Sequence, residues 1–136
     1  GTDKGAFRYP FLMALDKQKR LYIVDVINTR VQVMDPDGKS LAVIGGWGVE
    51  KGEFFRPKGV ALDNAGRVYV SDSYLGVIQV FDANGTFYAA LGDAQKGKVK
   101  KFKTPAGLFV DQRNRLYVVE MLANKVSVYQ IIDLKE

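Results

Sequence analysis

Histidine and cysteine are both absent from this 136-residue sequence. Without histidine the chain lacks the usual general base near neutral pH and the commonest zinc ligand, and it cannot build a Ser-His-Asp triad. Without cysteine it has no disulfide, no thiolate nucleophile and no cysteine-based metal site. Catalysis would have to rest on carboxylates, lysine or tyrosine alone. We therefore predict that the protein is not an enzyme and uses no metal or cofactor.

Long apolar runs are also missing, so no membrane span is predicted. A spanning helix needs about 20 apolar residues, whereas the longest runs here, such as residues 41–44, have the length of a strand. The first four residues resemble neither a signal peptide nor a transit peptide, which indicates a processed product or a piece of a longer chain. The net charge of +5 permits anionic partners, but solubility is its simpler explanation.

Internal repetition indicates the fold. Pro10, Pro57 and Pro105 recur at spacings of 47 and 48 residues, and a phenylalanine stands three residues before each of them. Further sets keep the same spacing: Asp16, Asp63 and Asp111; Tyr22, Tyr69 and Tyr117; Asp25, Asp72 and Glu120; Val31, Ile78 and Val126; Val33, Val80 and Val128. So many coincident registers indicate one structural unit repeated three times.

Each unit has the pattern of short strands separated by turns. β-branched and aromatic residues fill the apolar stretches, and residues 35–38 and 82–85 have sequences typical of hairpin turns. Four antiparallel strands in about 47 residues match a β-propeller blade. We predict an all-β fold of three four-stranded propeller blades at about residues 5–45, 52–92 and 100–134, the last strand being residues 131–134. A flat β-solenoid is the alternative.

The assembled pattern resembles the NHL repeat, whose motif begins Phe-x-x-Pro-x-Gly and continues through Leu-Tyr-Val-x-Asp and Arg-Val-x-Val-Phe to Asp-x-x-Gly. The fullest match lies in residues 54–63, 68–72 and 78–85, and the loop signature Asn-Thr-Arg-Val is kept at 28–31. The resemblance implies an interaction propeller, usually of six blades. Its members include RNA-binding and protein-binding modules, exported bacterial proteins and a lyase. The lyase's metal site depends on histidines, so that activity does not carry over to this chain.

Three blades make half of a six-bladed ring. Blades pack face to face, so an isolated arc would leave an apolar sheet face exposed at each end. We expect the ring to be completed either by further blades of a longer chain or by a second copy of this one about a two-fold axis.

The loops that follow the second and fourth strands of propeller blades lie on one face, which is where we expect binding. Trp47, the only tryptophan, lies between two glycines in a long loop of this kind, although it could instead cover a blade seam. The lysine run at 96–103 also suits a solvated loop. The candidate partner-binding residues are Trp47, Phe55, Tyr74, Lys96, Lys98, Lys100, Lys101, Lys103, Met121 and Leu122.

Other repeated residues are predicted to be structural. Phe7, Phe54 and Phe102 are expected to pack between blades. Two sets of acidic residues also recur and could be imagined as metal ligands: Asp16, Asp63 and Asp111, and Asp25, Asp72 and Glu120. Short acidic side chains at strand ends and turns usually accept backbone N–H bonds instead.

The leading functional hypothesis is a non-catalytic scaffold that binds a protein partner or larger assembly. Export to the periplasm or the extracellular space is expected, with the cytoplasm as the alternative. The second hypothesis is a nucleic-acid-binding module that uses the lysine run with Trp47 or Tyr74 as a stacking surface. A metal-dependent hydrolase or lyase ranks last, because the inner strands carry mainly apolar residues.

Overall fold

The computed structural model describes residues 1–92 and 101–132, and these residues form three antiparallel sheets. In each sheet the strand order follows the sequence. The first sheet contains β1 (Pro10–Leu15), β2 (Leu21–Asp25), β3 (Arg30–Met34) and β4 (Ser40–Ile44). The second contains β5 (Pro57–Leu62), β6 (Val68–Asp72), β7 (Val77–Phe81) and β8 (Phe87–Leu91). The third contains β9 (Pro105–Val110), β10 (Arg115–Glu120) and β11 (Lys125–Gln130).

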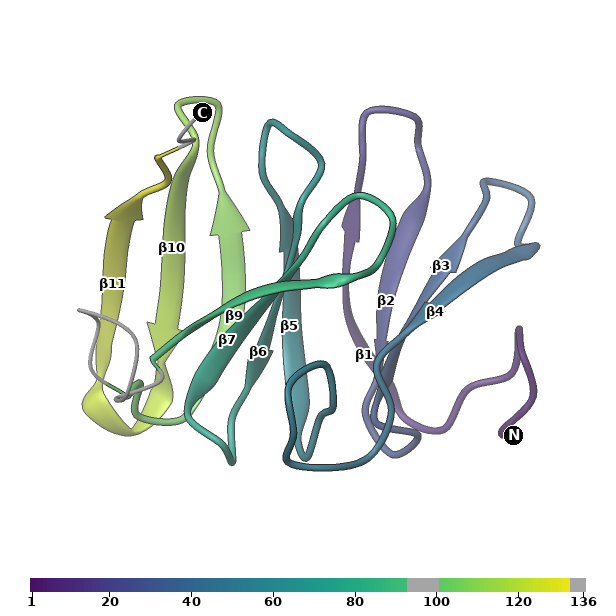
Figure 1. Ribbon diagram of the computed structural model, residues 1–136, viewed down its shortest axis with the longest axis horizontal. Helices are drawn as coiled ribbons and strands as arrows, with labels where there is room; N and C mark the ends of the chain where they lie inside the picture. Colours follow the sequence, from purple (N-terminus) through teal and green to yellow (C-terminus); the bar gives the residue numbers. More distant parts are fainter. Residues whose placement is uncertain (93–100, 133–136) are drawn as a thin grey trace.

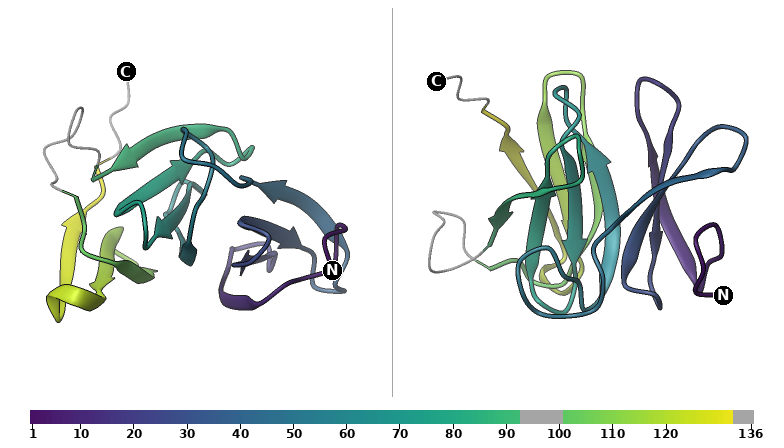
Figure 2. Two further views of the ribbon diagram at one scale, coloured as in Figure 1. Left: turned by 90° about the horizontal axis from the view of Figure 1, so that it is seen from below. Right: turned by 45° about the vertical axis from the view of Figure 1, so that its right-hand side comes forward.

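The three sheets stand side by side like part of a ring (Figures 1 and 2). Strand β5 packs against both β1 and β9, so the first strand of each sheet lies on the inside of the arc. The only helical element of the described chain is the short 3-10 turn η1 (Met121–Ala123). These sheets are propeller blades, as predicted, and we call them blades 1, 2 and 3. No helix among the described residues has the length and apolar character needed to cross a bilayer.

The final strand predicted at 131–134 is not formed in its described part. Ile131 and Ile132 lie outside any strand, and residues 133 and 134 are outside the described residues. Ile131 instead donates its backbone N–H to the Asn114 carbonyl and packs on the core between blades 2 and 3. No hairpin turn separates β11 from this segment, and such a turn closes the other two blades at residues 35–38 and 82–85.

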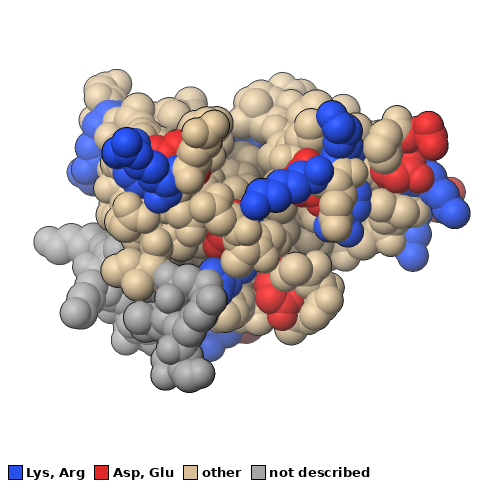
Figure 3. Space-filling view, turned by 90° about the horizontal axis from the view of Figure 1, so that it is seen from above, with Lys and Arg blue, Asp and Glu red and all other residues tan. Residues whose placement is uncertain are grey.

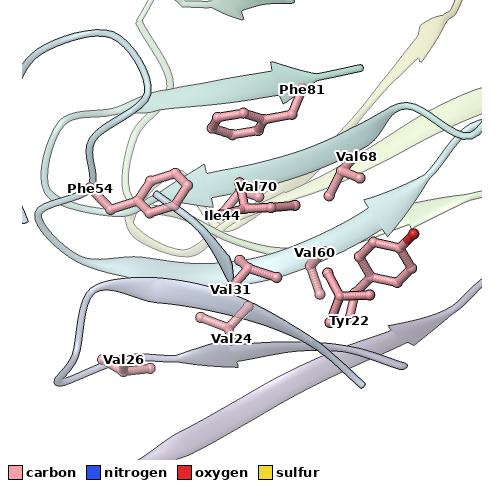
Figure 4. Packing of buried hydrophobic residues seen from close by; sticks show 11 residues of the cluster. Tyr22, Val24, Val26, Val31, Ile44, Phe54, Val60, Val68, Val70 and Phe81 are labelled. Carbon is pink, nitrogen blue, oxygen red and sulfur yellow. The ribbon is translucent and has the colours of Figure 1, made fainter. Parts of the chain in front are cut away.

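The hydrophobic core lies between the blades rather than within them. One cluster joins blades 1 and 2 around the fully buried Phe54, whose ring meets that of Phe81 edge-on at 5.7 Å (Figure 4). A second cluster joins blades 2 and 3 around Phe102. The predicted inter-blade packing is therefore confirmed for both residues. Phe7 holds the same register in blade 1, which has no neighbour on that side within the described residues, and is only half-buried.

The two outer faces of the arc are apolar and exposed. Val126 and Val128 of blade 3 are 57% and 52% exposed, whereas Ile78 and Val80 at the same register of blade 2 are 0% and 3% exposed. At the opposite end, Met13 of blade 1 is also largely exposed. The same side-chain pattern that builds the inner seams therefore continues onto faces that nothing in the described chain covers.

A carboxylate closes the turn between the first two strands of each blade. Asp16, Asp63 and Asp111 each accept two backbone N–H bonds within that turn, as predicted. Each also pairs with an arginine four residues on and accepts the hydroxyl of the repeated tyrosine, which the sequence analysis did not anticipate. Desolvation opposes ionisation of Asp111, but the hydrogen bonds from Arg115, Tyr117 and Arg113 outweigh it and lower its pKa to about 2.

Blades 2 and 3 approach most closely at Gly59. A Cβ atom at this position would lie 2.2 Å from the carbonyl oxygen of Ala106 in the next inner strand. The buried hydroxyl of Ser71 spans the same seam, accepting the Gly59 N–H at 2.8 Å and donating to the Ala106 carbonyl at 2.6 Å. Blade 1 has Leu12 and Val24 at these registers, so its seam with blade 2 is apolar instead.

We expect Gly59→Ala to lower the free energy of unfolding by about 1–3 kcal/mol, because the new methyl group must push two inner strands apart. Gly46→Ala is the matched control: a Cβ there meets nothing within 4 Å, and the cost should stay within about 0.5 kcal/mol. Urea denaturation of both variants measures the difference. Equal losses would contradict the close approach of β5 and β9.

Candidate binding site

Three aromatic side chains gather at the end of the arc where β2 joins β3 and β6 joins β7 (lower end in Figure 1). The Phe55 ring stacks on Tyr74 with centroids 4.3 Å apart, and the centroid of the Trp47 ring lies 6.3 Å from that of Phe55. Trp47 and Tyr74 are 69% and 65% exposed. We call these three residues the aromatic cluster. The structure thus brings together three residues that were predicted separately from their loops.

The loop that carries Trp47 is anchored by its neighbour Phe54. The Phe54 N–H donates to the Gly46 carbonyl at 2.7 Å, and the Gly48 N–H donates to the Phe54 carbonyl at 2.9 Å. Gly45 has a φ of +85°, and a Cβ there would lie 2.1 Å from the Phe54 ring, so only glycine fits. Because Phe54 is buried between blades while Phe55 belongs to the surface cluster, two adjacent residues join the core to the site.

Asp72 ties together the two loops that supply Phe55 and Tyr74. Its fully buried carboxylate accepts backbone N–H bonds from Phe55 at 2.6 Å, Arg56 at 3.1 Å and Tyr74 at 3.2 Å. A further bond comes from the Leu75 N–H at 3.0 Å. Four donors converging on one carboxylate fix the separation of the loops and therefore of the stacked rings.

The equivalent acidic residues serve the same purpose in the other blades. Asp25 accepts the Arg8 N–H at 2.8 Å, and Glu120 accepts the Lys103 N–H at 2.9 Å and the Ser127 hydroxyl. Desolvation of Glu120 is outweighed by these bonds and by the charge of Lys125, so its pKa is lowered. The prediction that this set accepts backbone N–H bonds is confirmed. The described residues contain no group of three or more acidic side chains placed to hold a metal ion.

A buried glutamine forms a second clamp that sequence analysis missed. Gln79 accepts the Gly52 N–H at 2.7 Å and donates to the Glu53 carbonyl at 2.5 Å, which fixes the loop just before Phe54. Gln32 holds residues 5 and 6 in the same way in blade 1. The available signal was a glutamine at one register of two repeats, flanked on both sides by core residues.

A groove of about 480 Å³ lies beside the aromatic cluster, at the seam between blades 1 and 2. We call it the seam groove. Its lining comprises Tyr9, Val26, Ile27, Thr29, Trp47, Arg56 and Lys58. Tyr9, Arg56 and Lys58 were not predicted as site residues, because they lie next to or within the first strand of a blade, where the repeat pattern indicates packing.

The cations of the seam groove rest on aromatic rings. The Arg56 guanidinium lies 4.9 Å from the Phe55 ring centroid and donates to the Phe55 carbonyl at 2.9 Å. The Lys58 ammonium lies 5.6 Å from the Phe11 ring. Neither side chain has a carboxylate within ion-pair distance in the described chain. At the opposite end of the arc, lysine and arginine lie next to acidic side chains (Figure 3), and Arg20 and Arg115 pair there with Asp16 and Asp111.

The remaining predicted residues are distributed over blade 3. Met121 and Leu122 are exposed on η1, at the same end of the arc as the aromatic cluster. Lys101 and Lys103 are exposed in the segment that leads into β9. Lys96, Lys98 and Lys100 lie outside the described residues. The ring contacts of the aromatic cluster end at Tyr74, so blade 3 adds no aromatic side chain to it within the described chain.

No protein-family model matches the sequence, and no curated protein matches it. Solved structures with a similar fold include a virginiamycin B lyase from Staphylococcus aureus, with a TM-score of 0.65 and 11% identity over 90% of this chain and 41% of the lyase. A gluconolactonase from Xanthomonas campestris has a TM-score of 0.63 and 19% identity over 86% of this chain and 36% of that chain. A candidate exported protein from Bacteroides fragilis has a TM-score of 0.66 and 17% identity, and the match covers 87% of this chain and 32% of that chain.

These likenesses concern the fold alone, because all identities are below one fifth. This chain spans less than half the length of each of these proteins. The class is therefore defined by architecture: the described chain is a three-bladed arc of a β-propeller.

We expect Asp72→Ala to lower the free energy of unfolding by about 3 kcal/mol or more, since four partly buried N–H groups lose their shared acceptor and a hydrogen bond to a charged group contributes about 1.5–3 kcal/mol. Asp35→Ala is the matched control. Asp35 also accepts two backbone N–H bonds, but in an exposed hairpin turn, and its loss should cost about 1 kcal/mol. Urea denaturation, followed by the fluorescence of Trp47, measures both. Similar costs for the two variants would show that Asp72 does not hold the loops as described.

Proposed function

We propose that this chain is a non-catalytic interaction module that binds another protein through the aromatic cluster and the loops around it. The observation that carries the proposal is the pair of exposed rings, Trp47 and Tyr74, held in place by the buried Asp72 and Phe54. Tryptophan, tyrosine and arginine dominate the binding energy of protein interfaces. Rings fixed before binding also lose little side-chain freedom when a partner arrives.

The blades are proposed to be NHL repeats of an exported protein. The repeat motif supports the first part, since its Phe, Pro, Asp and Tyr registers recur in all three blades. Similarity to a candidate exported protein supports location in the periplasm or outside the cell. The enzymes among the similar structures share only the fold with this chain, so we infer its function from its own residues instead.

Two further functions are kept as rivals. A nucleic-acid-binding module is favoured by exposed rings next to Arg56 and Lys58, because bases stack on such rings. A metal-dependent hydrolase or lyase has less support, because the repeated carboxylates already accept backbone N–H bonds. Binding to a protein partner is proposed ahead of both.

We expect Trp47→Ala and Tyr74→Ala each to weaken binding of a protein partner at least tenfold, the effect of losing an interface hot spot. Affinity purification from the source cells identifies the partner, and titration with the purified partner measures the dissociation constant. Tyr88→Ala is the control: Tyr88 is a similarly exposed aromatic residue, but it lies on the outer strand β8. A partner that binds the Trp47 and Tyr74 variants normally would contradict the proposed surface.

The two exposed end faces are proposed to be covered by blades of the same kind. Either a longer chain supplies them or a second copy packs its blade 1 on this copy's blade 3, a contact that two-fold symmetry makes twice. The exposed Val126 and Val128 at one end and Met13 at the other support this proposal, because their equivalents in the inner seams are buried.

We expect this chain, purified alone, to sediment as a dimer or larger assembly, and Val128→Glu to shift it toward the monomer. The substitution places a charge in an apolar contact that would have to desolvate it. Leu122→Glu, in the exposed η1 turn rather than in a strand of the end face, should leave the sedimentation coefficient unchanged. A folded monomer at high protein concentration would overturn the proposal.

A further inference from the structure

The seam groove combines apolar walls with positive charge. Tyr9 and Trp47 contribute rings, Val26 and Ile27 contribute aliphatic surface, and Arg56 and Lys58 contribute the charges. Its volume of about 480 Å³ falls within the range of about 300–1,000 Å³ typical of ligand sites. No carboxylate belongs to the lining.

The two buried carboxylates at this end of blades 1 and 2 do not neutralise the groove. Asp25 is fully buried and bonded to the Arg8 N–H and the Arg30 side chain. Asp72 is fully buried and bonded to four backbone N–H groups. Neither cation of the groove has a carboxylate within ion-pair distance in the described chain. Glu53 is the acidic residue closest in sequence to Arg56, and its carboxylate accepts the Glu50 N–H instead. An incoming anion would meet no acidic side chain of the lining.

The charge is specific to this seam and is not a property of the repeat. At the second seam the registers of Arg56 and Lys58 are occupied by Thr104 and Ala106, neither of which is charged. The Ala106 carbonyl there accepts the Ser71 hydroxyl within the core. Neither cation is needed to close a blade, because the second seam closes without them.

Tyr9 contributes a ring from an unfavourable backbone conformation. Its φ is +66°, which bulky residues rarely adopt, and its side chain is 65% exposed. The Val26 N–H donates to the Tyr9 carbonyl at 3.1 Å, which fixes the residue at the edge of the groove. Thr104, at the same register of blade 3, has a φ of +52°, so the backbone shape belongs to the repeat and the ring that it presents is what is particular to this groove.

From this geometry we propose that the seam groove binds an acidic segment of a partner protein, in which glutamate or aspartate side chains alternate with apolar ones. The carboxylates pair with Arg56 and Lys58, and the apolar side chains enter between Trp47, Ile27 and Tyr9. This inference rests on the proposed protein-binding function and specifies the partner's chemistry. A nucleic acid fits less well, because its affinity depends on many phosphate contacts and the groove offers two cations.

The test uses Trp47, the only tryptophan of the chain, as its own reporter. A synthetic peptide of alternating glutamate and leucine is titrated into the purified protein while tryptophan emission is recorded. We expect a saturable blue shift, because the indole loses contact with water, and weaker binding at higher salt because the contacts are ionic. A peptide of alternating lysine and leucine should give no saturable change.

Charge variants separate the ionic contacts from any structural role. The double variant Arg56→Met with Lys58→Met should weaken binding of the acidic peptide at least tenfold. The exchange Arg56→Lys with Lys58→Arg keeps both charges and should stay within about threefold. Arg113→Met, in an exposed turn at the opposite end of the arc, is the control and should bind like the wild type. Thermal unfolding of each variant verifies that it is folded.

The outcomes distinguish this inference from the function on which it rests. Absence of a saturable response to the acidic peptide, or tighter binding of polyuridylic acid than of the peptide, would overturn the inference. The proposed function would survive that result if the natural protein partner still lost affinity on Trp47→Ala. If the natural partner binds the Trp47→Ala variant normally, the proposed function fails as well, whatever the peptide does.

Discussion

The structure depends on a simple constraint: a four-stranded blade has two apolar faces and can bury them only against neighbouring blades. Phe54 illustrates this, because it is contributed by the loop before blade 2 and is buried among residues of blades 1 and 2. The same dependence explains why Val126 and Val128 are exposed although their registers are core positions elsewhere. Stability in such an arc is therefore a property of seams, and each terminal blade has one seam fewer than an inner one.

The buried carboxylates supply hydrogen-bond acceptors to the loops that enter each blade. The loops entering each blade cross the end of the arc, and their N–H groups are partly shielded from water, so they need acceptors within the protein. Asp72 supplies these acceptors to four N–H groups at once. In blade 3 the acceptor is Glu120, one methylene longer, and the buried glutamine of the other blades is replaced by Ser127, which donates to it. In blade 3 a longer acidic side chain is therefore combined with a shorter polar neighbour, Ser127 in place of glutamine.

The fold could be predicted from the sequence because many residues recur at the same spacing in all three units. The site could be predicted only in part. Trp47, Phe55 and Tyr74 were found from their loops, since exposed aromatic residues in long loops are unusual. Arg56, Lys58 and Tyr9 were missed because they lie at the start of inner strands, where the pattern predicts packing. Their role depends on which side chains face them across the seam. That relation joins residues about 20 or more positions apart in sequence, and a repeat pattern does not encode it.

The two seams differ at the registers that carry the charges of the seam groove. At the second seam Gly59 and Ser71 allow the inner strands to approach until the Ser71 hydroxyl bridges them through the Ala106 carbonyl. At the first seam the apolar Leu12 and Val24 occupy those registers, so the side chain that bridges the second seam has no equivalent there. The register of Ala106 carries a long side chain at the first seam, Lys58, which lines the groove. Substitutions at a few registers of one repeat therefore give the two seams different chemistry: a buried polar bridge at the second and exposed cations beside aromatic rings at the first.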